Sequence, residues 1–167
     1  AKHRSAWETV VLALILHTPM VVLKREVLRL PFLGWYFRKA GCIAVDRSGG
    51  MKALRRLRDD AVAAAGAGRS ILIFPQGTRA APGASLRYEI GVFSLYEATG
   101  LPVVPIALNS GHVWGRKSWL KRPGQIDVEF LPPIPPGLSR REFMARLEDD
   151  IESRMVVLDA PYLDSNG

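Results

Sequence analysis

Short, nearly continuous apolar runs alternate with helix-like patterns along this chain. The runs predict strands buried on both faces, at residues 21–23, 43–45, 71–74, 103–108 and 126–130. The segments between them have helical patterns, which predict helices at residues 7–16, 32–39, 51–65 and 89–99. This alternation predicts an α/β fold, with a layered, mostly parallel sheet flanked by helices.

The C-terminal part of the chain predicts a long helix behind a stiff connection. Prolines at 132, 133, 135 and 136 favour an extended passage. Ser139 and Glu142 then form a capping-box pattern, which marks a helix start. The apolar residues that follow have a core-facing spacing: Phe143, Leu147, Ile151, Met155 and Leu158. We expect this helix to be a structural cover, and we expect one domain because no repeat or linker divides residues 1–167.

Composition narrows the classes of protein. Hydrophobic residues make up 48% of the chain, enough for a sizeable core, and Cys42 as the only cysteine excludes a disulfide scaffold and a four-cysteine zinc site. With only three histidines, a metal site would need mostly carboxylate ligands, and we predict no metal site. The longest charge-free runs, residues 98–115 and 9–23, are shorter than the roughly 20 apolar residues of a membrane span.

The charge balance points to an anionic partner. The chain has 23 Lys+Arg against 16 Asp+Glu, a net charge of +7, and residues 24–58 hold much of the excess. Nucleic acid, a phospholipid surface and a phosphorylated small molecule all fit this charge. No helix-turn-helix, zinc or aromatic RNA-binding signature is present, so a basic nucleic-acid-binding domain stays a distant alternative. P-loop and nucleophile-elbow motifs are also absent.

A histidine and a carboxylate stand at the start of the first predicted helix. His3 and Glu8 are five residues apart, about 140° apart on a straight helix. If Ser5 is the N-cap, His3 lies in the preceding loop and its imidazole can fold back onto the Glu8 carboxylate. Such a dyad suits general-base chemistry, because the carboxylate stabilises imidazolium while the other ring nitrogen takes a proton. In the structural alternative, Ser5 and Glu8 form a capping box and His3 is solvated.

A second candidate follows the strand predicted at 71–74. The strand stops at Pro75, Gly77 permits a tight backbone path, and Thr78 and Arg79 then project from the strand end. Ligands of open α/β sheets bind beyond the carboxyl ends of strands, and an arginine beside a glycine there suits a phosphate. The alternative is an ordinary turn with a surface arginine.

In four blocks, the chain resembles the 1-acylglycerol-3-phosphate acyltransferase family of glycerolipid synthesis. His3 and Glu8 match a block of histidine, four residues and aspartate. Residues 74–79 match Phe-Pro-Glu-Gly-Thr-Arg except at Gln76, and residues 103–108 match an apolar strand with a proline. The remaining block is matched by Lys24, Arg25, Glu26, Val27, Pro31, Gly34, Gly41, Asp46 and Arg47. The departures are Glu8 for Asp, Gln76 for Glu, and Glu89-Ile90 where Lys-Pro is expected.

The resemblance implies one acyltransferase domain over residues 1–167, with a glycerol-3-phosphate acyltransferase-like fold. It implies transfer of a fatty acyl group from acyl-CoA or acyl carrier protein to the free hydroxyl of lysophosphatidate, making phosphatidate for phospholipid synthesis. His3 would be the general base and Glu8 would orient it. The residues implied in substrate binding are Lys24, Arg47, Gln76, Gly77, Thr78 and Arg79. No metal or cofactor is implied beyond the thioester co-substrate.

The resemblance also implies a phospholipid membrane surface as partner, and no nucleic acid. The basic stretch 24–58, with Trp35, Tyr36 and Phe37, would face anionic headgroups at the cytoplasmic face of the inner or plasma membrane. Only two residues precede His3, so we expect the chain to lack the family's N-terminal membrane-binding helical region. Because Glu8 and Gln76 depart from the family, a catalytically impaired membrane-binding relative and another lysolipid acyltransferase stay open as alternatives.

Overall fold

A parallel sheet of three strands lies at the centre of the computed structural model, which describes residues 1–17, 19–45, 49–81, 83–84, 86–115 and 120–163. The strands are β1 (Met20–Lys24), β2 (Ile43–Val45) and β3 (Ile71–Leu72), and β1 lies between the other two. Val22 is in register with Ile43, and Met20 with Ile71. The predicted α/β class, with a sheet flanked by helices, is confirmed.

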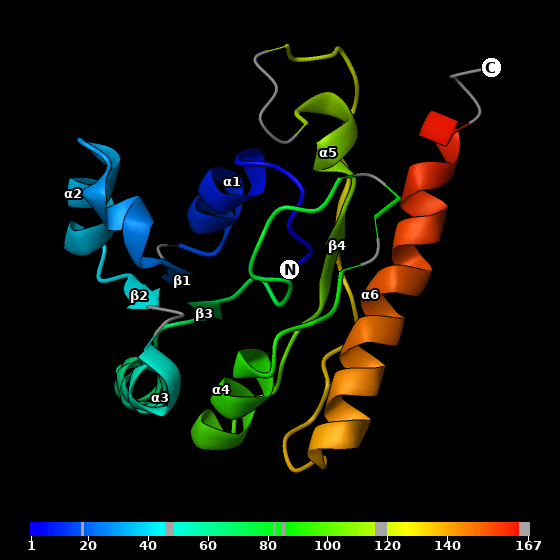
Figure 1. The fold of residues 1–167 in the computed structure, drawn as a ribbon. Coiled ribbons are helices and arrows are strands. Elements are labelled where there is room, and N and C mark those ends of the chain that lie inside the picture. Colours follow the sequence, from blue (N-terminus) through cyan, green and yellow to red (C-terminus); the bar gives the residue numbers. More distant parts are fainter. Residues whose placement is uncertain (18, 46–48, 82, 85, 116–119, 164–167) are drawn as a thin grey trace.

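Helices lie on both sides of this sheet (Figure 1). Helices α1 (Trp7–Ile15) and α2 (Leu33–Lys39) are on one side, and α3 (Gly50–Gly66) and α4 (Gly91–Thr99) are on the other. Leu12 of α1 belongs to one buried cluster with Val21 and Leu72. Leu57 of α3 belongs to another with Met20. Strand residues are thus covered from both sides, which is why their sequence shows no polar alternation.

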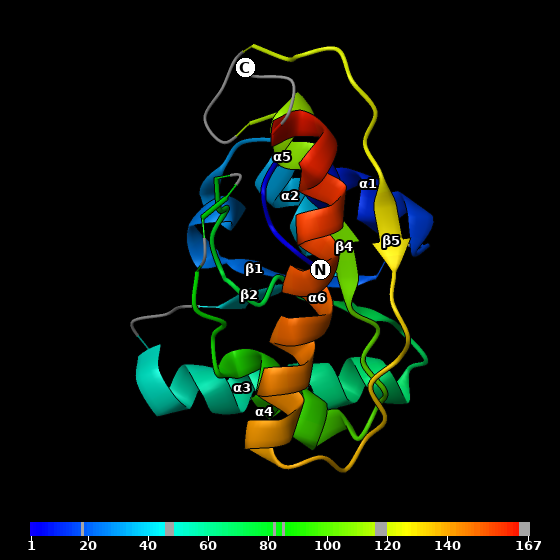
Figure 2. The same cartoon turned by 90° about the vertical axis from the view of Figure 1, so that its right-hand side faces the viewer.

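A second layer stands beside the parallel sheet. Strands β4 (Ile106–Leu108) and β5 (Val128–Phe130) pair antiparallel, and α6 (Arg140–Leu163) runs along β4 (Figure 2). The apolar stripe predicted for this helix is buried throughout: Phe143, Leu147, Ile151, Met155 and Leu158. The predicted capping box also forms, because the Ser139 N–H donates to Glu142 Oε2 at 3.0 Å and the Glu142 N–H donates to Ser139 Oγ at 3.4 Å.

Several boundaries differ from the sequence predictions. The predicted strand 71–74 ends at Leu72, and those at 103–108 and 126–130 are shortened to β4 and β5. The helix predicted from residue 32 begins at Leu33, because Phe32 has a φ of 61°. The helix predicted from residue 89 begins at Gly91, and the Glu89 N–H just before it donates to the Pro75 carbonyl at 2.7 Å. Two short helices were not predicted, η1 (Arg25–Arg29) and α5 (Ser110–Val113).

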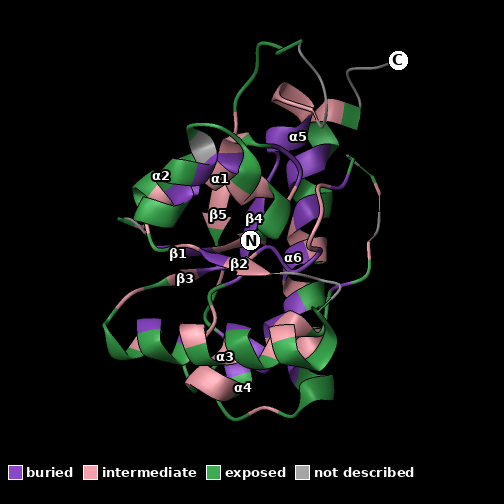
Figure 3. Ribbon diagram, turned by 60° about the vertical axis from the view of Figure 1, so that its left-hand side comes forward, coloured by how far each residue is buried: buried purple, intermediate pink, exposed green. Residues whose placement is uncertain are grey.

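The surface of α2 corrects one expectation about its aromatic residues. Helix α2 carries both exposed and buried parts (Figure 3). Trp35 is 63% exposed and Tyr36 is also exposed, but Phe37 is only 5% exposed. Phe32, at the N-cap of the helix, is 89% exposed. Within the described ranges, no helix combines the length and the apolar character needed to cross a bilayer.

Candidate active site

Hydrogen bonds made by the backbone of His3 and of its neighbour Lys2 hold the His3 main chain in place. The neighbouring Lys2 N–H donates to the Ile106 carbonyl of β4 at 2.9 Å, and the Ala80 N–H donates to the His3 carbonyl at 2.8 Å. The His3 N–H donates to Gln76 Oε1 at 3.1 Å. The imidazole stacks on the Phe74 ring with 4.2 Å between ring centroids. The loop after β3 and the edge of β4 together therefore set the position of His3.

The predicted contact between His3 and Glu8 is present. Nδ1 of His3 lies 2.9 Å from Oε1 of Glu8, in the first turn of α1. The same oxygen accepts the backbone N–H groups of Arg4 and Ser5, each at 2.6 Å. Ser110 Oγ of α5 donates to Oε2 at 2.7 Å. Every one of these donors favours the charged carboxylate.

Part of the predicted capping box between Ser5 and Glu8 is also present, together with the His3–Glu8 contact. Glu8 Oε1 accepts the Ser5 N–H, as a capping box requires, and Ser5 Oγ accepts the Trp7 N–H at 3.1 Å. The N-cap position itself falls on Ala6, one residue later than expected. Since Glu8 caps the helix with the same oxygen that contacts His3, the start of α1 presents its carboxylate to the imidazole.

The Glu8 carboxylate is buried yet favours its ionised form. Burial alone raises its pKa, but the hydrogen bonds from His3, Ser5 and Ser110 outweigh burial and hold the pKa below its usual value. An ionised carboxylate beside Nδ1 favours a proton on that nitrogen. Nε2 is then left as the basic nitrogen of the ring.

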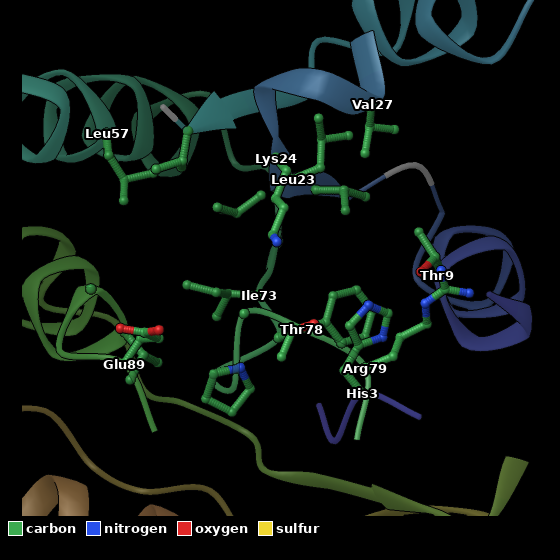
Figure 4. Close-up of a pocket in the computed structure, with 18 of the residues that line it drawn as sticks. His3, Thr9, Leu23, Lys24, Val27, Leu57, Ile73, Thr78, Arg79 and Glu89 are labelled. Atoms are coloured by element: carbon green, nitrogen blue, oxygen red, sulfur yellow. The ribbon is translucent and has the colours of Figure 1, made fainter. Parts of the chain in front are cut away.

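A cleft of about 840 Å³ begins at His3 and extends between the sheet and its helices (Figure 4). Its walls are mostly apolar, with residues from four elements and from the segment after β3: Val21, Leu23, Val27, Leu54, Leu57, Ile73 and Val92. Thr78 and Arg79 lie beside His3 in Figure 4, Lys24 extends into the cavity from the end of β1, and Glu89 stands on the far side. The cleft thus combines a basic, polar part at His3 with an apolar part.

The structure brings most of the predicted site residues to this cleft. Lys24, Gly77, Thr78 and Arg79 all line it, and the φ of 59° at Gly77 suits the turn in which its N–H donates to the Phe74 carbonyl. Within the described ranges, neither Lys24 nor Arg79 has an ion-pair partner. Their charges are available to an anion.

One predicted residue lies away from the cleft. Gln76 does not line the cleft: it is 2% exposed, its Oε1 accepts the His3 N–H, and its Nε2 has no partner among the described residues. The structure therefore gives it a contact with the His3 backbone, not with the cavity. Arg47 lies outside the described residues. Among those that are described, no group of three or more His, Cys, Asp or Glu side chains is arranged to hold a metal ion.

Two side chains that the structure connects to the site had no role predicted from the sequence. Ser110 lies on a helix that was not predicted, although Asn109-Ser110-Gly111 follows the carboxyl end of β4, where ligands of α/β sheets bind. Asp159 lies on α6, which was expected only to cover the core, yet it holds the Arg4 guanidinium. No local pattern marks Asp159.

These features define an α/β domain with a histidine–carboxylate pair on the wall of a cleft that is basic near the histidine and apolar elsewhere. Residues 1–109 match the family model described as Acyltransferase, and the chain belongs to that family.

Named relatives and a solved structure extend this similarity. The chain is 40% identical over 134 residues to the 1-acyl-sn-glycerol-3-phosphate acyltransferase of Pseudomonas aeruginosa, covering 80% of this chain and 52% of that protein. It is 28% identical over 168 residues to the enzyme of the same name from Escherichia coli, covering 95% and 66%. The crystal structure of the 1-acyl-sn-glycerophosphate (LPA) acyltransferase PlsC from Thermotoga maritima shares the fold, with a TM-score of 0.78 at 22% identity, over 95% of this chain and 64% of that chain. The chain therefore spans about half to two thirds of the length of these three relatives.

Proposed function

We propose that the protein transfers a fatty acyl group from a thioester, acyl-CoA or acyl carrier protein, to the free hydroxyl of 1-acylglycerol-3-phosphate. The product is phosphatidate, so the protein would serve phospholipid synthesis. The observation that carries this proposal is the contact between His3 and the buried, ionised Glu8 at the wall of the cleft. Family membership and the names of the relatives support the same reaction.

In the proposed chemistry, His3 acts first as a general base and then as a general acid. Nε2 of His3 takes the proton of the acceptor hydroxyl, while the Nδ1–H group keeps its hydrogen bond to the Glu8 carboxylate. The hydroxyl oxygen forms a bond to the thioester carbonyl carbon, and the tetrahedral intermediate then breaks its C–S bond. The thiolate leaves with the proton held by His3, which restores the neutral ring. His3 and the two substrates make every bond change, so no step calls for a metal ion or a prosthetic group.

The acceptor's phosphate and acyl chain fit different parts of the cleft. Arg79 and Lys24 supply positive charge near His3, and Gly77 and Thr78 lie beside them, so we place the phosphate there. Arg47 stays a predicted ligand from the family resemblance. The apolar walls suit a fatty chain, and a volume of about 840 Å³ lies within the range of small-molecule sites.

The rim of the cleft supports a phospholipid surface as the partner. Val10 of α1 and Leu30, just after η1, both line the cleft, and both are exposed. Next to Leu30, Phe32 and Trp35 are exposed as well, and the neighbouring basic residues are Arg25, Arg29, Arg38 and Lys39. Apolar and aromatic side chains beside cations suit an anionic membrane surface. We therefore propose binding at the cytoplasmic face of the inner or plasma membrane, with no nucleic-acid partner.

A direct assay tests the reaction. Purified protein is given lysophosphatidate in vesicles with acyl-CoA or acyl carrier protein as donor, and phosphatidate and free thiol are both measured. We expect equal amounts of the two products, and a kcat about 10²–10⁴-fold lower for His3→Ala, the usual share of general-base catalysis. No phosphatidate from the folded wild type with either donor would overturn the proposal.

Two further outcomes of the assay would decide between the alternatives. Vesicle binding without turnover would identify a catalytically impaired relative. Faster acylation of a lysolipid without a free phosphate would identify a different acceptor.

A further inference from the structure

Two buried cations flank His3, and both pair with carboxylates of α6. His3 lines the cleft, whereas the side chains of Lys2 and Arg4 on either side of it are buried against α6. Lys2 is 0% exposed and pairs with Glu152, while Arg4 is 2% exposed and pairs with Asp159. The two carboxylates are seven residues apart, about two helical turns, which puts them on one face of α6. The C-terminal helix thus holds the chain on both sides of His3.

The pair at Arg4 has the better geometry for fixing a position. Nη1 and Nη2 of Arg4 donate to Oδ1 and Oδ2 of Asp159 at 2.6 Å and 2.7 Å, a bidentate pair that fixes both partners. The backbone N–H of the same Arg4 donates to Glu8 Oε1 at 2.6 Å. Asp159 is therefore connected to the Glu8 carboxylate through one intervening residue.

Asp159 reaches Glu8 by a second route, through α5. His112 Nε2 lies 2.9 Å from Asp159 Oδ1, and Ser110, on the same helix, donates to Glu8 Oε2. Between them, α5 packs directly on Arg4: a Cβ added at Gly111 would lie 3.0 Å from the Arg4 Cβ. Asp159 thus contacts both Arg4, which donates to Glu8 Oε1, and α5, whose Ser110 donates to Glu8 Oε2.

We propose that Asp159 is a positioning residue for the His3–Glu8 pair, acting through Arg4 and through α5. As a statement about catalysis, this inference rests on the proposed function. Glu8 has a long, flexible side chain, and its donors on both oxygens select the conformation that reaches Nδ1. Small displacements of a catalytic pair are costly, since 1 Å can reduce the rate about 100-fold. Without Asp159, Arg4 is a buried cation without its counter-ion, and the backbone that contacts Glu8 moves with it.

Asp159→Asn tests this role, with Glu129→Gln as the matched control. Glu129 of β5 pairs with Arg154 of α6, so each substitution removes a carboxylate that pairs with an arginine. In the described part of the chain, the Glu129 side chain bonds to Arg154 and to none of the site residues. The first readout is the tautomer of the neutral His3 ring, from the ¹⁵N shifts of Nδ1 and Nε2, and it needs no turnover. The second readout is kcat and KM for acyl transfer.

We expect Asp159→Asn to lower the fraction of His3 rings with the proton on Nδ1, and to lower kcat about tenfold or more with KM within about twofold. Glu129→Gln keeps the wild-type tautomer and kcat. A purely structural role for Asp159 would lower the melting temperature and leave both readouts of the folded protein unchanged, and that result would overturn the proposal.

A second variant covers the case in which Asp159→Asn does not fold. Arg4→Met with Asp159→Leu replaces the buried pair by apolar side chains of similar volume, which proteins often tolerate. We expect the same loss of the Nδ1–H tautomer, and a wild-type tautomer in this folded variant would overturn the proposal. If the wild type showed no acyl transfer, the proposed function would fail, while the tautomer measurement would still decide whether Asp159 positions the pair.

Discussion

The Nδ1 atom of His3 lies 2.9 Å from Oε1 of Glu8, although the family to which the chain belongs is expected to carry aspartate at this position. The additional methylene is accommodated because Glu8 lies in the first turn of α1 and is held by donors on both oxygens. The longer side chain therefore preserves the histidine–carboxylate contact. In the proposed reaction, this pair would depend on the carboxylate and on the groups that hold it.

The first prediction separates the charge of Glu8 from its length. Glu8→Asp keeps the carboxylate, so we expect kcat within about tenfold of wild type. Glu8→Ala leaves imidazolium without its counter-ion, so we expect kcat to fall at least about 100-fold. Glu142→Ala is the control, because Glu142 is the capping-box carboxylate of α6 and has no histidine partner. Equal losses in Glu8→Asp and Glu8→Ala would show that side-chain length is what matters.

The second prediction concerns stability at acid pH. Because the pKa of Glu8 is lower in the folded protein than in the unfolded chain, the unfolded chain binds more protons once the pH falls below about 4.5. The stability that Glu8 contributes is therefore present above that pH and is lost as the pH falls further. Urea unfolding of wild type and Glu8→Gln should show a difference in unfolding free energy that shrinks as the pH falls below about 4.5. A constant or growing difference would contradict the lowered pKa.

Much of this architecture could be predicted because it is local. Val21 and Leu72 lie in continuous apolar runs, which predict strands with both faces covered, and both are buried in one core cluster. His3 and Glu8 are close in sequence, and a helix start near Ser5 was enough to propose their contact. The side chains that hold this pair could not be found in this way. Ser110 is 102 residues from Glu8, and Asp159 is 155 residues from Arg4, so only the folded chain brings them together.

Misplaced residues have equally physical causes. Gln76 follows the strand end, where a ligand is expected, but its carbonyl turns to the His3 N–H and its side chain becomes buried. Phe37 shares a helix with exposed Trp35 and Tyr36, and the helical rotation carries it to the interior. In both cases tertiary packing decided the orientation of one side chain, which the local sequence does not specify.

The third prediction concerns Gln76. Glutamate at this position keeps an oxygen that can accept the His3 N–H, and neutral Gln76 cannot transfer a proton here, so we expect Gln76→Glu to change kcat by at most about tenfold. Gln76→Leu removes the acceptor and leaves a buried N–H unpaired, so it should lower kcat more. Steady-state kinetics at matched folded fraction checks both. A 10³-fold gain in Gln76→Glu would instead identify an impaired relative.

The fourth prediction separates binding from chemistry at Arg79. A phosphate held equally in ground and transition states contributes to KM and not to kcat. Charge-assisted hydrogen bonds contribute about 1.5–3 kcal/mol each, so Arg79→Ala should raise the KM for lysophosphatidate by tens- to a hundredfold. Arg79→Lys should recover part of this, because it keeps the charge and loses the bidentate fork. Arg56→Ala, at an exposed arginine outside the cleft, should leave KM unchanged.

An acceptor without phosphate is the control for this assignment. Wild type should use it poorly, and Arg79→Ala should affect it little. If the substitution reduced the use of phosphorylated and neutral acceptors alike, Arg79 would not be the phosphate ligand. The anion would then have to be sought at Lys24, Arg25 or Arg47.

The last prediction tests the membrane surface at the rim of the cleft. Phe32 is 89% exposed and Trp35 is also exposed with Lys39 Nζ 5.0 Å from its ring, so together they offer apolar area beside a cation. Burying one such side chain contributes about 1.5–3 kcal/mol, and a membrane interface realises part of that for each. Phe32→Ser with Trp35→Ser should therefore weaken binding to phosphatidylglycerol-containing vesicles at least about tenfold in a sedimentation assay. Val156→Ser is the matched control, because Val156 is 71% exposed on α6, away from the cleft rim. Binding of wild type should also weaken in high salt, because the basic residues are screened. Equal loss in the Val156→Ser control, or none in the double variant, would place the membrane surface elsewhere on the molecule.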